Sequence, residues 1–406
     1  MKNIFLINAH WNNRGDEAAV CAVLDELVIK SDVNISVQIK AIDVQQFNYH
    51  DKVRLVPIFP RLHDLPELLL GTISKGKFVW SKNGKNFFNN LMNADIVVHA
   101  PGGPSIGDIY SISEITYLAT YLSIIHFKKK IFFYAPSMGP FDKKFRNAIR
   151  RKILKYAEVI VLREEISKLY LNKLIPDNRA VVTLDAAFQS KIDKEANERK
   201  LLKYVELKNF IDSDIKIIGM TITDLSWHPI YSKNEDLVKR ITLEIRKIID
   251  ILIGKEYRVL LIPQLFGEAN DSLFMNKFSN EDCMVMSDEY DAYFQQYIIG
   301  KMYALIGMRY HSNIFSAKMG VPFISISYEQ KMKGFIENIN YEKYCIDIEK
   351  FSANKVIEKF NDLIKNYDEV KKVLMLKQTE LYKESHKTTE MLFKLLETSY
   401  EKSTIN

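Results

Sequence analysis

The feature that most constrains the fold is an alternation of short apolar runs with helix-like segments, which occurs twice along the 406 residues. Such an alternation is typical of βαβ units and predicts parallel sheets. In the first half the expected strands are 3–8, 95–100, 131–136, 158–162 and 181–184. In the second half they are 215–222, 258–263, 283–287, 304–307 and 322–327.

The segments between these runs complete the expected domain plan. Residues 16–30 have the spacing of an amphipathic helix, residues 191–208 form a charged linker or linking helix, and the tail from residue 355 to about 402 is helical without Gly or Pro. We therefore expect an N-terminal domain, 1–190, and a C-terminal domain, 191–375. A C-terminal helix, 376–406, would follow, and its packing back on the N-terminal domain is left open.

Composition excludes several classes of protein. The net charge of +6 is spread along the chain without a dense basic run, which argues against a nucleic-acid partner. No run approaches the roughly 18 apolar residues of a membrane span. Three widely separated cysteines and no zinc-like spacing predict neither disulfide framework nor metal site, and no cofactor is expected. We expect a cytoplasmic protein, with contact to the inner face of the membrane left open.

Ligands of such sheets bind beyond the carboxyl ends of the strands, so the residues there are the candidates for function. The first strand leads into a loop in which Gly15 permits a tight turn at the start of a helix. Asp16 and Glu17 follow. Their carboxylates could act at a ligand site, or they could simply cap the helix and complement its dipole.

Three further strand ends of the first half carry candidates. Gly102 and Gly103 would let backbone amides approach a ligand, and Ser137 and Gly139 lie in a similar loop. The alternative for both loops is an ordinary tight turn. Arg163 sits where a strand passes into a helix, so its guanidinium could bind a carboxylate or phosphate. The alternative there is a salt bridge to Glu164, Glu165 or a neighbouring loop.

The second half places three cationic or protonatable side chains at two neighbouring strand ends. Arg309 and His311 are two residues apart after one strand, and Lys331 follows the next. Arginine supplies a permanent charge, and histidine exchanges a proton near neutral pH. Such a group suits a small, highly charged anion.

These stretches together resemble the polysaccharide pyruvyltransferase family. The matching pieces run in family order from about residue 3 to 334 and are NRGDEAAVCAVL, HAPGGPSIGD, YAPSMGPF, VLREEISKLYL, LDAAF, IGMTI and GMRYHSNIFSAKMGVPFISISYEQKMKGF. The last piece is the most specific. The resemblance implies two facing Rossmann-like domains of the GT-B kind, an acceptor side in the first and a donor side in the second.

The resemblance also implies an activity. Family members transfer the pyruvyl group of phosphoenolpyruvate to two hydroxyls of a sugar, which forms a cyclic ketal in a cell-surface polysaccharide such as a capsule or exopolysaccharide, or in its lipid-linked precursor. The family's Arg-x-His pair falls on Arg309 and His311, and the arginine of its R[DE]xxS motif falls on Arg163. We expect these arginines and Lys331 to bind the donor, and Gly15 and the two glycine loops to contact ligands.

The chemistry assigns roles to these residues. Ketal formation needs a proton at the methylene carbon of the donor, and His311 is the expected general acid. Asp16 is the expected base for the acceptor hydroxyl. Residues 43–90 mix apolar and cationic side chains and predict either an acceptor-binding and membrane-facing segment or a helix that covers the sheet.

Two departures from the family pattern leave alternatives open. Gln264 stands where many relatives have histidine, and Pro104 follows Gly102 and Gly103. An altered acceptor or donor would account for both. A sugar-nucleotide-dependent glycosyltransferase or epimerase on the same fold therefore stays open, with Glu268, Asp271 or Glu329 as a ribose anchor. A binding protein without catalysis is the third interpretation, and the pair Arg309 and His311 argues against it.

Overall fold

The computed structural model describes residues 1–11, 13–29, 32–40, 49–266 and 270–401, and contacts divide the chain into two units. The first unit comprises Met1–Asn12, Ala19–Gln189 and Lys383–Asn406, and the second comprises Asn13–Ala18 and Ser190–Tyr382. Helix α1 (Arg14–Ile29) and the last helix, α15 (Tyr367–Glu401), each contribute residues to both units. The expected domain ranges put residues 13–18 wholly with the first half, whereas their contacts group them with the second.

The first unit is built on a seven-stranded sheet in which all adjacent strands are parallel. In spatial order the strands are β3 (Val53–Pro57), β2 (Val33–Lys40), β1 (Lys2–His10), β4 (Ile96–His99), β6 (Lys130–Phe133), β8 (Val159–Leu162) and β9 (Val181–Val182). Beside it, β5 (Gly102–Ile106) and β7 (Pro136–Met138) form a separate two-stranded parallel sheet.

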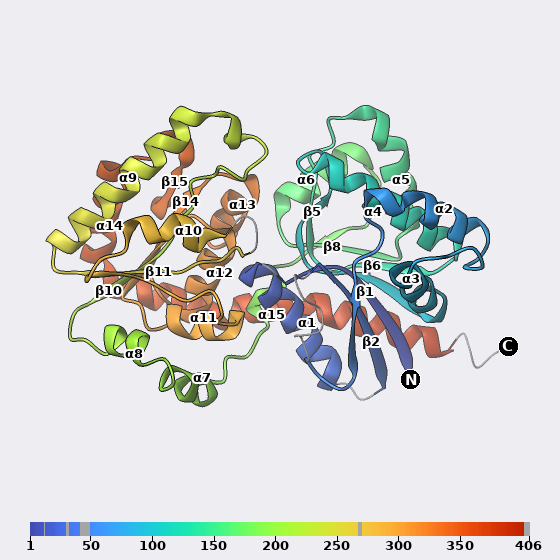
Figure 1. Ribbon diagram of the computed structural model, residues 1–406, viewed down its shortest axis with the longest axis horizontal. Coiled ribbons are helices and arrows are strands. Elements are labelled where there is room, and N and C mark those ends of the chain that lie inside the picture. The colour runs from blue at the N-terminus through green and yellow to red at the C-terminus, as the bar shows by residue number, and fades with distance from the viewer. Residues whose placement is uncertain (12, 30–31, 41–48, 267–269, 402–406) are drawn as a thin grey trace. The chain divides into compact units, whose positions relative to one another are not determined.

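Helices lie on both faces of the seven-stranded sheet, as Figure 1 shows, which explains why most of its strands are apolar runs. The helices between strands are α2 (Leu65–Ile73), α3 (Lys82–Asn93), α4 (Ser111–His126), α5 (Asn147–Tyr156) and α6 (Glu165–Leu174). The last part of α15 also belongs to this unit, where Thr388 and Gln189 anchor it. The Thr388 hydroxyl lies 2.7 Å from that of Thr183, and the Gln189 amide donates to the carbonyl of Ser385 at 2.7 Å.

The second unit is built on a six-stranded sheet whose adjacent strands are again all parallel. Its strands are β12 (Cys283–Val285), β11 (Arg258–Leu261), β10 (Ile217–Thr221), β13 (Ala304–Gly307), β14 (Phe323–Ser327) and β15 (Cys345–Asp347). The helices of this unit are α7 (Lys194–Leu201), α8 (Val205–Ile211), α9 (Glu235–Gly254), α10 (Asp271–Met275), α11 (Ala292–Ile299), α12 (Tyr310–Met319), α13 (Gln330–Asn338) and α14 (Ala353–Lys365).

Both sheets follow the doubly wound strand order of a Rossmann fold. In each, the first strand lies in the middle, the next two pair successively on one side, and the later ones continue on the other. The chain therefore reverses direction across the sheet between β1 and β4, and between β10 and β13. In open sheets of this kind the ligand site lies outside the carboxyl ends of the strands at such a switch point.

The predicted α/β class is confirmed, and every strand predicted from an apolar run is confirmed to within three residues at each end. Five strands are missing from the prediction, namely β2, β3, β5, β7 and β15. Residues 191–208 form parts of two helices, α7 and α8, and the predicted helical tail is confirmed as α14 and α15. The glycine loop around Gly102 was expected as a turn or an open loop, and this was wrong, because these residues form β5 and pair with β7. Among the described helices, none is both long and apolar enough to cross a bilayer.

Candidate functional site

The switch point of the second unit gathers the charged and aromatic side chains that follow β10, β13 and β14. Trp227 and His228 come from the segment after β10, Arg309 and His311 from the junction between β13 and α12, and Glu329 from the junction between β14 and α13. All except Trp227 are buried. Parallel strands bring their carboxyl ends to one edge, so residues distant in sequence meet there.

Arg309 is held in a fixed orientation by Asp271 and Trp227. Its Nε donates to Oδ2 of Asp271 at 3.2 Å, its Nη2 donates to the other carboxylate oxygen, and its guanidinium lies 4.7 Å from the centre of the Trp227 ring. Asp271 is itself oriented by the backbone N–H groups of Gln264 and Leu265, each at 3.0 Å. Burial acts against the charge of Arg309, but the adjacent Asp271 carboxylate raises the pKa of the guanidinium, which therefore stays charged.

Lys331 and His228 both pair with the same carboxylate, that of Glu329. The ammonium of Lys331 lies 2.6 Å from one oxygen, and Nε2 of His228 lies 3.2 Å from the other. Burial alone would raise the pKa of Glu329, but Lys331 and His228 outweigh it and lower the pKa to about 2. Glu329 is therefore ionised at any physiological pH. Sequence reasoning missed His228, because it lies in an irregular segment without a recognisable motif.

Aromatic rings connect the Arg309 and Lys331 groups. The Tyr328 ring lies 6.4 Å from Trp227, which covers Arg309, and 5.8 Å from His228, which pairs with Glu329. Lys331 lies 5.8 Å from the ring of Tyr310, the residue between Arg309 and His311. The structure thus brings together all three residues that the second half was expected to supply.

His311 lies in the first turn of α12 and packs directly against Gly15. A Cβ atom added to Gly15 would lie 1.9 Å from Nδ1 and 2.0 Å from Cγ of the imidazole. Only glycine permits this approach, because any side chain would overlap the ring. Gly15 lies in the first turn of α1 and not in the tight turn predicted for it, and it makes a close packing contact with the expected general acid.

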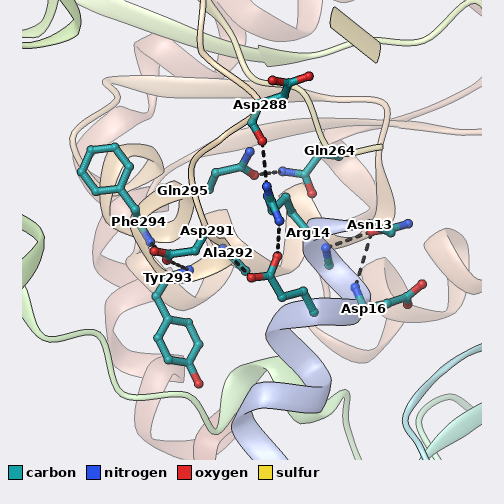
Figure 2. Close-up of polar contacts among 12 residues, drawn as sticks. Asn13, Arg14, Asp16, Gln264, Asp288, Asp291, Ala292, Tyr293, Phe294 and Gln295 are labelled. Carbon is teal, nitrogen blue, oxygen red and sulfur yellow. Dashed lines mark hydrogen bonds and ion pairs between the residues drawn. The ribbon is translucent and has the colours of Figure 1, made fainter. Parts of the chain in front are cut away.

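The residues on either side of Gly15 form a second charged group, drawn in Figure 2. Arg14 donates to Glu17, with Nη1 and Oε2 2.5 Å apart, and to the carbonyl of Asp288 at 2.7 Å. The backbone N–H of Arg14 donates to the carbonyl of Gln264 at 2.9 Å. The side chain of Gln264 in turn donates to Gln295 at 2.8 Å. Gln264 is therefore part of an uncharged amide pair.

Asp16 and Glu17 differ sharply in environment. Asp16 is half-buried, and in Figure 2 its carboxylate points away from Arg14 and Gln264. Glu17 is buried, and desolvation raises its pKa from 4.5 to about 7 despite the opposing effect of Arg14. A carboxyl with a pKa near neutrality can take up or release a proton under working conditions. Glu17 thus joins Asp16 as a candidate base.

The first unit gathers the remaining expected residues around Arg163. Ser137 accepts a hydrogen bond from Nε of Arg163 at 2.9 Å, and Asp185 accepts from Nη1 at 2.6 Å. Glu164 lies 3.3 Å from Nε. All four residues are buried. The alternative of a salt bridge to a neighbouring residue is therefore present. Together these contacts join β7, the residue after β8 and the segment after β9.

The glycine candidates of this unit pack in the same region. Gly102 pairs with Pro136, and Gly139 adopts a φ of +83° that favours glycine. A Cβ on Gly139 would lie 2.8 Å from the ring of Tyr170, whereas one on Gly103 would meet nothing within 4 Å. Gly139 is required by packing, and Gly103 leaves room beside its Cα.

The acidic side chains considered as ribose anchors are engaged in ion pairs where they are described. Asp271 holds Arg309, and Glu329 holds Lys331. Glu268 lies outside the described residues. Within the described ranges, no three His, Cys, Asp or Glu side chains are grouped so that they could bind a metal ion.

Fold and site together define an α/β protein of two Rossmann-like units with a cationic group at the switch point of the second. The chain matches the polysaccharide pyruvyl transferase family over residues 13–330 and belongs to that family. This membership makes it a transferase of polysaccharide biosynthesis. The match includes Arg14, Glu17, Arg163, Arg309 and His311, and Lys331 follows its last residue directly.

One relative and two solved structures extend the comparison. The amylovoran biosynthesis protein AmsJ of Erwinia amylovora is 22% identical over 405 residues, which span 91% of this chain and 94% of that protein. The UDP-GlcNAc 2-epimerase from Neisseria meningitidis bound to UDP-GlcNAc has a TM-score of 0.60 at 16% identity, with 97% of this chain and 100% of that chain covered. A putative UDP-N-acetylglucosamine 2-epimerase from Listeria monocytogenes has a TM-score of 0.62 at 13% identity, with 99% and 98% covered. The likenesses to the two solved structures show the fold alone, and they confirm its GT-B-like class.

The contact between Gly15 and His311 predicts a specific effect of a single methyl group. Gly15→Ala should displace the imidazole and cost about 1–3 kcal/mol in the free energy of unfolding, because the added Cβ overpacks a filled site. The matched control is Gly254→Ala, where a Cβ would meet no atom within 4 Å. The measurements are thermal unfolding and the imidazole chemical shifts of His311. Unchanged shifts in Gly15→Ala would contradict the packing described.

The raised pKa of Glu17 predicts how stability depends on pH. Between pH 4.5 and about 7 the folded chain keeps a proton on Glu17 that the unfolded chain has released, so this group's stabilisation is lost as the pH rises. Relative to Glu17→Gln, the wild type should lose up to about 3 kcal/mol in unfolding free energy between pH 4 and 8.

The measurement is urea unfolding of both proteins across this pH range, with the exposed Glu358→Gln as a control that should follow the wild type. A constant difference between wild type and Glu17→Gln would show that Glu17 titrates normally.

Proposed function

We propose that this protein transfers the pyruvyl group of phosphoenolpyruvate to two hydroxyls of a sugar and forms a cyclic ketal during polysaccharide biosynthesis. The observation that carries the proposal is the meeting of Arg309, His311 and Lys331 at the switch point of the second unit. Family membership supports the transferred group. The relative AmsJ, whose name assigns it to amylovoran biosynthesis, supports a polysaccharide context.

The donor is a small molecule with a carboxylate and a phosphate, so its site must supply several cations or hydrogen-bond donors. Arg309 has five N–H donors, more than the two that Asp271 accepts, and Lys331 adds an ammonium. The first turns of α12 and α13 add backbone N–H groups, which favour anions. Neither Arg309 nor Glu329, the residues that precede these helices, caps its helix with its own side chain.

The carboxylates of Asp271 and Glu329 determine the orientation and the net charge of the cationic group. Arg309 pairs with Asp271 and Lys331 pairs with Glu329, so each of these two pairs is formally neutral. The partners orient Arg309 and Lys331 and prevent repulsion between them in a buried site. We infer that the donor binds the guanidinium of Arg309 and the ammonium of Lys331, and that its affinity depends on how these two groups are arranged as well as on their charge.

The reaction then proceeds by proton transfer and two additions. The imidazolium of His311 gives its proton to the methylene carbon of the donor, and positive charge develops at the central carbon. One sugar hydroxyl adds there, and its proton passes to Asp16 or Glu17. The bond to the phosphate oxygen breaks and inorganic phosphate leaves, after which the second hydroxyl adds, loses its proton and closes the ketal. No bound metal or organic cofactor enters these steps.

Arg163 takes a different place in this scheme from Arg309. Its guanidinium already binds Asp185, Glu164 and Ser137 in a buried network. We infer that it fixes β7 and the glycine residues beside it, and we keep a direct contact with the donor as the alternative. The acceptor side is assigned to the first unit, which carries Gly102, Gly103, Ser137 and Gly139.

The test is incubation with phosphoenolpyruvate and a panel of soluble and lipid-linked sugars that carry free neighbouring hydroxyls. The product is read as the mass gain of one pyruvate ketal together with release of inorganic phosphate. His311→Gln should reduce turnover by about 10²–10⁴-fold, the usual contribution of positioned acid–base catalysis, and should leave donor affinity within a few-fold. The control is His63→Gln, since His63 is exposed. Near-normal turnover in His311→Gln would remove His311 from this role.

Arg309→Lys addresses donor binding separately. An ammonium cannot reproduce the forked geometry, and loss of a charge-assisted hydrogen bond costs about 1.5–3 kcal/mol, so affinity should fall roughly ten- to over a hundredfold. Calorimetric titration measures this, with the exposed Arg199→Lys as control and thermal unfolding to detect misfolding. Unchanged affinity would place the donor elsewhere.

A further inference from the structure

Helix α2 and the segments on either side of it expose large apolar side chains on the first unit. Phe78 and Trp80 in the segment after the helix are 68% and 60% exposed. Together with four aliphatic side chains they form what we call the apolar ridge: Leu62, Leu69, Leu70, Ile73, Phe78 and Trp80. Surface patches of this kind in a soluble protein mark a binding surface.

The sequence of α2, LPELLLGTI, explains how the ridge arises. Leu68 and Gly71 face the interior, and Leu65 packs against the same core. Leu69, Leu70 and Ile73 occupy the opposite side of the helix, where a surface helix normally carries polar residues. A helix that is apolar all round is found in a buried or membrane-contacting position. Within the first unit only one side of α2 is buried, and its other apolar side remains exposed.

The segment that carries the two aromatic side chains is held in place by a buried carboxylate. Oε1 of Glu67 accepts hydrogen bonds from the backbone N–H groups of Trp80 at 2.9 Å and Ser81 at 2.7 Å. Gly76, at a φ of +85°, ends α2 by donating to the carbonyl of Gly71 at 2.7 Å. Phe78 and Trp80 are therefore exposed on a defined segment.

The charges around the apolar ridge are almost all positive. Residues 61–93 contain five Lys and Arg side chains, namely Arg61, Lys75, Lys77, Lys82 and Lys85, and all are exposed. The two carboxylates of this stretch are both engaged. Glu67 is buried, and Asp64 accepts the backbone N–H of Arg61 at 2.8 Å.

The neighbouring helices continue the same character. Helix α4 packs against both α2 and α5, and Figure 1 shows the three helices on the same side of the sheet. Ile112 in the first turn of α4 is exposed, and so are Phe145, just before α5, and Ile149, within α5. Two arginines just before and in α5, Arg146 and Arg150, pair with Glu114. The exposed cations of residues 141–156 are Lys143, Lys144, Arg151, Lys152 and Lys155.

We propose that this face docks on the surface of an anionic phospholipid bilayer, with Phe78 and Trp80 among the lipid headgroups and the surrounding lysines on the lipid phosphates. Apolar and aromatic side chains ringed by lysine are typical of interfacial membrane contacts. Protein–protein interfaces, in contrast, are depleted in lysine. Docking of this kind would hold the enzyme where lipid-linked saccharides are found, and it does not depend on which donor the second unit binds.

The experiment is co-sedimentation of the full chain with vesicles of phosphatidylcholine alone and of phosphatidylcholine mixed with phosphatidylglycerol. The wild type should bind the anionic vesicles, and binding should weaken as salt is added. The variants Phe78→Ser with Trp80→Ser, and Lys75→Glu with Lys77→Glu, should each bind at least tenfold more weakly. The control Leu243→Ser with Lys255→Glu changes exposed residues of the second unit and should bind like the wild type.

Two further measurements distinguish membrane docking from misfolding and from dimerisation. Trp80 should shift its fluorescence on addition of anionic vesicles, and Trp80→Phe should lose that shift while Trp11 and Trp227 remain. Thermal unfolding checks that each variant is folded. The proposal is overturned if folded wild type does not bind anionic vesicles or if both double variants bind equally well. It is also overturned if light scattering shows a wild-type dimer that Phe78→Ser with Trp80→Ser dissociates, because the face would then join two copies.

Discussion

The organisation of the second unit depends on the buried ion pair between Arg309 and Asp271. Arg309 follows β13 and Asp271 begins α10, so the pair joins two elements at the carboxyl edge of the sheet. The same carboxylate accepts the N–H groups of Gln264 and Leu265, and the carbonyl of Gln264 accepts the N–H of Arg14. One chain of polar contacts therefore fixes the site from Arg309 to the start of α1. Removal of either charge would leave the other buried and unpaired, which typically costs about 3–5 kcal/mol.

A second constraint is the absence of a side chain at Gly15. Because the imidazole of His311 occupies the space that a Cβ would need, the start of α1 and the start of α12 approach each other in the second unit. Glu17, in the first turn of α1, is buried beside Arg14 and has a pKa near 7. The same short segment thus positions a histidine and supplies a titratable carboxyl, and it explains why residues 13–18 group with the second unit.

The sequence predicts the sheets well because parallel strands covered on both faces are continuous apolar runs. It fails for β2, in which apolar and polar residues alternate, and for β3, which ends in a proline at the edge of the sheet. It also fails for β15, which has only three residues. Arg309, His311 and Lys331 are predictable because each closely follows an expected strand. The contact of Gly15 with His311 and the pairing of His228 with Glu329 are not predictable, since they depend on how irregular segments fold back over the sheet. The chemical roles of all these residues remain predictions.

The central claim is that the cationic group of the second unit binds phosphoenolpyruvate. The most direct measurement is the shift of the thermal unfolding midpoint on addition of phosphoenolpyruvate, compared with addition of UDP-GlcNAc at the same concentration. Phosphoenolpyruvate at about 100 times its Kd should stabilise the fold by about 2.7 kcal/mol, and UDP-GlcNAc should leave the midpoint unchanged. Stabilisation by UDP-GlcNAc without stabilisation by phosphoenolpyruvate would contradict the account and favour a sugar-nucleotide-dependent enzyme on the same fold.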